Sequence, residues 1–171
     1  MSVCIDVFSG VGGLGMLLPL TPVLYVEKDA FAQSVLEARM VTGALARAPI
    51  LADVRTVPYV EGVHYIIAGF PCQSVSSIGK QTGLASDSGT QSSLFHSVID
   101  VAVHLTVPCL FLENVEGLLQ QRANWEVVLQ SLHSAGYDVY WTTVGACRCG
   151  APHQRLRWFA LCLLQRGRNV A

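Results

Sequence analysis

Cys72 follows shortly after the predicted end of a strand. The segment Gly69-Phe70-Pro71-Cys72-Gln73-Ser74 follows the apolar run 65–68, which is typical of a strand. Pro71 restricts its own φ and biases Phe70 towards an extended conformation, so the backbone would hold the Cys72 thiol in place. Such a thiol can act as a nucleophile if suitable groups lie around it. A cysteine buried in a proline-containing turn is the simpler alternative.

Charged residues accompany two later apolar runs. Glu113 directly follows the run 109–112, and Arg155 and Arg157 stand at the entrance to the run 156–164. In open α/β sheets, ligands and chemistry collect at the carboxyl edge, where we expect the thiol and the carboxyl group to lie. Each residue also has an ordinary explanation: Glu113 could cap a helix, and the arginines could belong to a solvated strand face.

A glycine-rich turn follows the first β-prone run, residues 3–8. The segment Ser9-Gly10-Val11-Gly12-Gly13-Leu14-Gly15 is typical of a turn that lets a ligand approach backbone at a helix start. Glu27 and Asp53 end the next two predicted strands, 23–26 and about 49–52. With Asp6 or Gly10 they outline a nucleoside-sized pocket, although Glu27 alone could be a solvated charge.

Strand and helix patterns alternate along the chain. Asp29 can cap a helix with Phe31, Val35 and Ala38 on its apolar face. Two more helices are predicted from apolar stripes, and the remaining strands are 64–68, 109–112, 137–143 and 156–164. The stripes are Leu94, Phe95, Val98, Val101, Ala102 and Leu105, and Trp125, Val128, Leu129 and Leu132. This order predicts one doubly wound α/β domain over residues 1–171, mostly parallel, with a final antiparallel strand.

The composition indicates which broad classes of protein this sequence can belong to. Hydrophobic residues make up 51% of the 171 residues and charged residues only 13%, which suits a sheet covered on both faces. The net charge of −1 gives no electrostatic indication of nucleic-acid binding. No apolar stretch is long enough to span a membrane, and no secretory signal is recognisable, so we expect an intracellular protein.

The six cysteines do not predict disulfides or a metal site. Cys4, Cys109 and Cys162 fall on predicted strands and should be core residues. Cys147 and Cys149 are separated by one residue, which is poor spacing for metal ligands without a second pair. We therefore predict no metal.

Four motifs in order carry a resemblance to a known family. "DVFSGVGGLG" (6–15), "GFPCQSVS" (69–76), "ENV" (113–115) and "PHQRLR" (152–157) resemble the motifs of DNA (cytosine-5-)-methyltransferases. The resemblance extends from residue 3 to about residue 164 and implies a Rossmann-like S-adenosyl-L-methionine-dependent methyltransferase fold. It covers the family's catalytic domain, without the target-recognition domain and the C-terminal motifs that follow in the family.

The resemblance also implies roles for individual residues. Cys72 would add to carbon 6 of cytosine, protonated Glu113 would donate to ring nitrogen 3, and Arg155 and Arg157 would orient the base. The substrate would be duplex DNA with a flipped cytosine, and the polar segment 76–91 would close over it. S-adenosyl-L-methionine would be bound by Phe8, Gly10, Gly12, Gly13, Glu27, Asp53, Pro71 and Leu94.

The sequence departs from the family pattern at several points. His153 replaces the usual glutamine, Lys28 follows the ribose-binding acid, and an arginine is absent between Asp87 and Leu94. The missing regions could reflect truncation, a degenerate relative or a split enzyme, in which a second chain would supply target recognition. A tRNA cytosine methyltransferase, disfavoured by Phe70, and a non-catalytic cofactor-binding or regulatory subunit are the alternatives.

Overall fold

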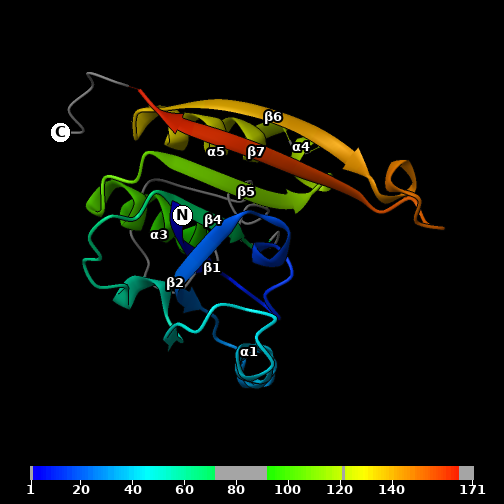
Figure 1. The fold of residues 1–171 in the computed structure, drawn as a ribbon. Coiled ribbons are helices and arrows are strands. Elements are labelled where there is room, and N and C mark those ends of the chain that lie inside the picture. Colours follow the sequence, from blue (N-terminus) through cyan, green and yellow to red (C-terminus); the bar gives the residue numbers. More distant parts are fainter. Residues whose placement is uncertain (1, 72–91, 121, 166–171) are drawn as a thin grey trace.

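The computed structural model describes residues 2–71, 92–120 and 122–165, which form a seven-stranded sheet with helices packed on it (Figure 1). The strand order is β3-β2-β1-β4-β5-β7-β6, and β7 runs antiparallel to the other strands. The predicted fold class is confirmed. The strands are β1 (Ser2–Val7), β2 (Leu20–Val26), β3 (Ile50–Leu51), β4 (Tyr65–Gly69), β5 (Cys109–Val115), β6 (Tyr137–Gly145) and β7 (Leu156–Leu164).

Helices α3 and α5 cover one face of the sheet. The main core joins their apolar residues to strand residues that are completely buried, among them Ile66, Leu110 and Trp158. The stripe predicted for α3 is confirmed, because its members from Phe95 to Leu105 are buried. The described helices are α1 (Ala30–Val41), α3 (Ser92–His104), α4 (Gly117–Gln120) and α5 (Arg122–Ser134), with short 3-10 turns η1 (Gly15–Leu17), η2 (Val54–Thr56) and η4 (Ala146–Cys149).

Helix α1 begins as predicted but presents another face to the core. The Asp29 side chain accepts a hydrogen bond from the Ala32 N–H at 2.8 Å, which confirms the N-cap. Its buried residues are Ala32, Leu36 and Met40, whereas Phe31 is 75% exposed. The predicted apolar face was therefore wrong. Leu36 and Met40 pack against Tyr25 of β2, and this contact sets the rotation of the helix.

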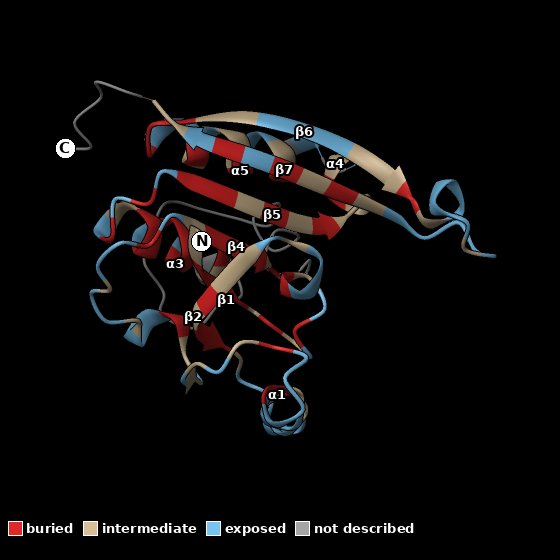
Figure 2. Cartoon of the chain, viewed as in Figure 1, coloured by how far each residue is buried: buried red, intermediate tan, exposed pale blue. Residues whose placement is uncertain are grey.

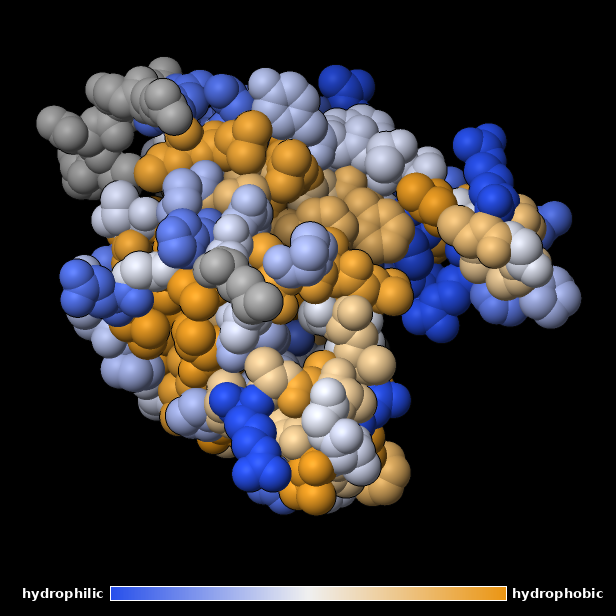
Figure 3. Space-filling view, in the orientation of Figure 1, coloured by the Kyte–Doolittle hydropathy of each residue, from blue (hydrophilic) through white to orange (hydrophobic). Residues whose placement is uncertain are grey.

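The second face of the sheet is covered over only part of its width. Near β1 and β2 it is buried, but further along the sheet exposure increases (Figures 1 and 2). We call the group Phe111, Tyr140, Phe159, Leu161 and Leu163 the open strand face; Tyr140 is 61% exposed and Leu163 is 40% exposed. Hydrophobic side chains are prominent on the side of the molecule shown in Figure 3. An apolar surface of this kind is typical of an interaction site.

Strand β5 is longer than predicted. It continues through Val115 because its ladder with β7 extends to the pair Val115–Arg157. Glu113 and Asn114 therefore lie within the strand, and the alternative that Glu113 caps a helix is wrong.

The buried cysteines behave as core residues. Cys4, Cys109 and Cys162 lie on strands and are 0%, 6% and 0% exposed. Burial raises the pKa of these thiols to about 12, 11 and 12, so they are poor nucleophiles at neutral pH. Within the described part of the chain, no helix combines the length and apolar character that crossing a membrane requires.

Candidate active site

The predicted acid and one predicted arginine are in direct contact. Arg157 Nε lies 2.9 Å from Glu113 Oε1, and both side chains are about three-quarters buried. The contact forms because β5 and β7 are neighbours and the two residues stand two positions apart on the same face of the ladder. Arg157 therefore orients the Glu113 carboxylate and leaves its other oxygen, Oε2, directed towards β4.

Gly69 makes room for that second oxygen. It pairs with Glu113 across the β4–β5 ladder, and a Cβ at position 69 would stand 3.2 Å from Glu113 Oε2. The last residue of β4 and the acid are thus at the same level of the sheet. Cys72 follows Gly69 by three residues but lies outside the described residues, as does the segment 76–91.

Asn114 holds the turn that leads towards the cysteine. Its Nδ2 donates a hydrogen bond to the Phe70 carbonyl oxygen at 3.1 Å, and its Oδ1 accepts one from the Val115 N–H at 2.8 Å. Asn114 is 2% exposed, and its bond to Phe70 is buried. Phe70 also packs against Phe95 and Trp158, with ring centroids 4.9 and 6.4 Å away. The approach to Pro71 is consequently fixed by a buried hydrogen bond and aromatic packing.

The two predicted arginines occupy different surroundings. Arg157 is partly buried beside Glu113, whereas Arg155 is exposed and precedes the first residue of β7. The Arg155 carbonyl accepts a hydrogen bond from the Ala146 N–H at 2.9 Å, which ties it to η4. The structure therefore brings Arg157 to the acid and leaves the Arg155 side chain at the surface.

The glycine-rich turn is shaped for close approach at two positions. A Cβ placed on Gly10 or Gly13 would meet nothing within 4 Å, so the backbone there faces open space. Gly12 differs, because its φ is 83° and a Cβ would stand 2.6 Å from Leu45 Cδ1, so backbone conformation and packing both favour glycine. Phe8, at the start of the turn, adopts a φ of 55° and is partly buried against the core. A non-glycine residue in this conformation is uncommon.

Glu27 joins the glycine turn to the end of β2. Its Oε2 accepts a hydrogen bond from the Gly10 N–H at 2.7 Å, and its Oε1 accepts one from the Asp29 N–H at 2.8 Å. A carboxylate oxygen has two acceptor sites, so each could still accept a ribose hydroxyl. The predicted proximity of Glu27 and Gly10 is confirmed.

Asp53 caps η2 just beyond β3 and is bound by a neighbour. Arg55 contacts both carboxylate oxygens, the shortest distance being 2.6 Å between Arg55 Nη2 and Asp53 Oδ2. The hydrogen bonds from Arg55 lower the pKa of Asp53 to about 2, so the side chain is ionised at physiological pH. Asp53, the acid predicted to bind the adenine amine, is thus charged, but its carboxylate is already hydrogen-bonded to Arg55.

Asp6 is an isolated carboxyl group beneath the glycine turn. It is 1% exposed, and within the described residues its Oδ2 has no hydrogen-bond partner. Burial raises its pKa to about 7. Gly15 lies directly above it, since a Cβ there would stand 2.9 Å from Asp6 Oδ2.

These residues fit a bound nucleoside-containing cofactor. Open backbone at Gly10 and Gly13 and carboxylates at Glu27 and Asp53 lie at the ends of neighbouring strands, which is the chemistry such a ligand requires. The two remaining residues assigned by resemblance, Pro71 and Leu94, are partly buried, and Leu94 packs against the main core.

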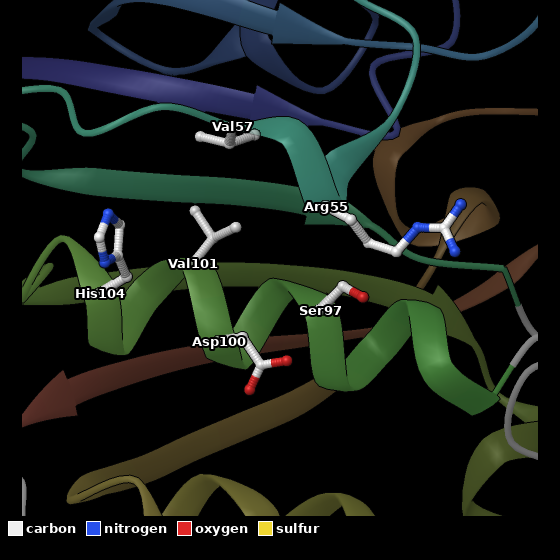
Figure 4. Close-up of a pocket in the computed structure, with 6 residues that line it drawn as sticks. All are labelled: Arg55, Val57, Ser97, Asp100, Val101 and His104. Carbon is white, nitrogen blue, oxygen red and sulfur yellow. The ribbon is translucent and has the colours of Figure 1, made fainter. Parts of the chain in front are cut away.

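A groove of about 320 Å³ lies beside Asp53, between η2 and α3 (Figure 4). Val57 and Val101 face each other across it, with Arg55 and His104 towards its two ends. Ser97 and Asp100 of α3 complete the lining. The sequence did not predict this groove.

Sequence reasoning missed two residues that shape the site. Asn114 was read only as part of the "ENV" motif, although its side chain bonds a carbonyl 44 residues away. Arg55 stands two residues after Asp53, and this spacing of opposite charges could have indicated an ion pair.

Comparison with known proteins agrees with this geometry. The model of the family described as C-5 cytosine-specific DNA methylase matches residues 3–170. The type II methyltransferase M.MspI from Moraxella sp. is 31% identical over 166 residues, which are 94% of this chain and 38% of that protein. M.CviJI from a Paramecium bursaria Chlorella virus is 32% identical over 164 residues, or 93% of this chain and 42% of that protein.

A solved structure shares the fold. The S. pombe Dnmt2 methyltransferase superposes with a TM-score of 0.70 over 99% of this chain and 53% of that chain, at 19% identity. The present chain spans about two fifths of the length of the two curated relatives. Because the family model matches nearly the whole chain, this protein belongs to the C-5 cytosine-specific DNA methylases.

Proposed function

We propose that residues 1–171 are the catalytic and cofactor-binding domain of an enzyme that methylates carbon 5 of cytosine in DNA. The observation that carries the proposal is the placement of Glu113, which pairs with Arg157 and faces Gly69, three residues before Cys72. This arrangement puts an oriented carboxyl group on the strand next to the one that leads to the cysteine.

Each side chain has a distinct task in the proposed reaction. Carbon 5 of cytosine is a weak nucleophile, so the Cys72 thiolate adds to carbon 6 and pushes electrons into the ring. Glu113 holds a proton at ring nitrogen 3 and neutralises the negative charge that develops there. Arg157 keeps the Glu113 carboxyl group in position, and exposed Arg155 is available for the base or a phosphate. Carbon 5 would then take the methyl group, with S-adenosyl-L-homocysteine as the other product. Loss of the carbon-5 proton to solvent and expulsion of the Cys72 thiolate would restore the aromatic ring.

S-adenosyl-L-methionine is the proposed cofactor, and it supplies an electrophilic methyl group. Gly10 and Gly13 leave space beside the backbone, while Glu27 can accept the ribose hydroxyls and Asp53 the adenine amine. Phe8 is placed at the start of the same turn for contact with the adenine ring. Gly12 supports the turn by packing, and Pro71 and Leu94 complete the proposed pocket.

Target recognition is proposed to come from further polypeptide. The target base must leave the duplex to react with the Cys72 thiol, and the net charge of −1 gives this domain little attraction for DNA. The relatives are more than twice as long as the matched region. The additional region, in the same chain or in a second chain, would cover the open strand face, whose residues are apolar and exposed.

Methyl transfer from labelled S-adenosyl-L-methionine tests the proposal. The purified chain is incubated with duplex DNA or with transfer RNA, alone and with the product of the neighbouring reading frame. We expect label in DNA, and we expect Cys72→Ser to abolish it. Transfer that survives Cys72→Ser would refute the covalent mechanism, and transfer to RNA only would refute DNA as substrate.

Two further readouts separate the alternatives. A duplex with 5-fluorocytosine at the target should trap the protein covalently through Cys72, which mass spectrometry can locate. Cofactor binding without methyl transfer under any pairing would instead identify a non-catalytic subunit.

A further inference from the structure

Arg55 occupies nearly the whole hydrogen-bonding capacity of Asp53. Oδ1 accepts bonds from the Arg55 backbone N–H at 3.0 Å and from its Nε at 2.9 Å. Oδ2 lies 3.1 Å from Nε and 2.6 Å from Nη2. The single Nε hydrogen is shared between the two oxygens, so three hydrogens of one residue occupy a carboxylate that offers about four acceptor positions. An incoming amine therefore competes with Arg55 for Asp53 while the guanidinium stays in place.

The guanidinium is not needed to orient the acid. The Arg55 backbone N–H already fixes Oδ1 through the N-cap of η2, and this bond would survive removal of the side chain. The ion pair is also exposed, with 57% of the Arg55 side chain and 36% of the Asp53 side chain accessible to water. Exposed pairs are weak, so a ligand can displace such a guanidinium at small cost.

We propose that Arg55 gates the adenine-amine position of the cofactor pocket by competing for Asp53. The inference rests on the function proposed above and concerns a residue that the family motifs do not include. Arg55 is a positioning residue, since it acts through Asp53 and not on the reacting atoms.

The groove next to η2 offers the displaced side chain a destination. Arg55 lines this groove together with Asp100, whose carboxylate is exposed on α3 (Figure 4). Ser97 and Asp100 give this groove a polar lining near a guanidinium that Asp53 releases. While Arg55 is in place, its hydrogen bonds lower the pKa of Asp53, and an exposed aspartate also stays charged at neutral pH without them.

Binding of S-adenosyl-L-homocysteine by calorimetry tests the inference without requiring activity. We expect Arg55→Ala to tighten binding about 1.5- to 5-fold, the range that the strength of an exposed ion pair predicts. Arg122→Ala is the matched control, since it removes another exposed arginine from an ion pair at the start of α5 and should leave binding unchanged. A ligand with inosine in place of adenosine lacks the amine and should bind the wild type and Arg55→Ala equally.

Salt provides a second readout that a general structural effect would not reproduce. Raising the salt concentration from about 0.05 to 0.5 M screens the Arg55–Asp53 pair, so wild-type affinity should approach that of Arg55→Ala. Equal or weaker binding by Arg55→Ala, or equal tightening for the inosine ligand, would overturn the inference while leaving the cofactor site intact. Failure of the wild type and the variant alike to bind would refute the proposed cofactor site, and the inference with it.

Discussion

Replacement of Asp6 by asparagine should change how the stability of the protein depends on pH. The Asp6 carboxyl is 1% exposed beneath Gly15, and burial raises its pKa from 3.8 to about 7. Below pH 4 the group is protonated in both the folded and the unfolded state. As pH rises from 4 to 7, the unfolded state releases its proton first and is favoured.

The size of the effect follows from the two pKa values. The difference between 3.8 and about 7 corresponds to roughly 4 kcal/mol of folding stability, all of it lost once the pH exceeds 7. Between pH 5 and 8, the free energy of unfolding of the wild type should therefore fall by about 2–3 kcal/mol, and that of Asp6→Asn should not show this fall. An uncharged amide in the same place has no proton to release.

Urea unfolding of both proteins at several pH values between 5 and 8 measures this difference. Asp100→Asn, which neutralises an exposed carboxylate on α3, is the control and should follow the wild type. Parallel stability profiles for the wild type and Asp6→Asn would show that Asp6 ionises normally in the folded protein and would refute the reasoning.

Three further substitutions test contacts described above, each by urea unfolding. Asn114→Ala should lower the free energy of unfolding by about 1–3 kcal/mol, because the Phe70 carbonyl loses its buried donor; a change below about 0.5 kcal/mol would contradict this. Gly15→Ala should cost about 1–3 kcal/mol, since its Cβ would stand 2.9 Å from Asp6 Oδ2, and unchanged stability would show that the turn relaxes freely. Tyr137→Phe should cost about 1 kcal/mol by removing the 2.7 Å bond from its hydroxyl to the Val107 carbonyl, and increased stability would contradict that role.

The fold was predictable because the burial of a strand or a helix determines the pattern of apolar residues in its sequence. Strands buried on both faces read as continuous apolar runs, and the run 65–68 falls within β4, where Ile66, Ile67 and Ala68 are all buried. Helix α3 was predictable for a related reason, since one uninterrupted apolar stripe faces the core. Asp29 was predictable as an N-cap because the interaction is local.

Features that depend on distant partners were not predictable. The rotation of α1 is set by Tyr25 on β2, which no pattern within the helix reveals. The extension of β5 through Val115 depends on β7, more than 40 residues later. The bond from Asn114 to the Phe70 carbonyl likewise joins segments that only the folded sheet brings together.

The candidate site was predictable in its residue types more than in its contacts. Glu113 and Arg157 were expected near the same edge, but their 2.9 Å ion pair required the ladder geometry. Gly10 and Glu27 were expected at neighbouring strand ends, and a hydrogen bond joins them there. The hydrogen bonds from Arg55 to Asp53 were not predicted. The spacing of the two charges could have indicated an ion pair, but the side-chain rotamers decide which carboxylate oxygens the guanidinium contacts.

The pairing of Gly69 with Glu113 has a consequence for how this protein can evolve. The register between β4 and β5 places both residues. A deletion of one residue in β5 before Glu113 would turn the Glu113 side chain to the face covered by α3 and α5. A change in the length of a loop would not bring the Glu113 side chain back to its original face of the sheet. By contrast, insertions between β6 and β7 beyond η4 would leave the acid and the glycine in register. Natural length variation should therefore be confined to the connections, while strands β4 and β5 tolerate substitutions but neither insertions nor deletions.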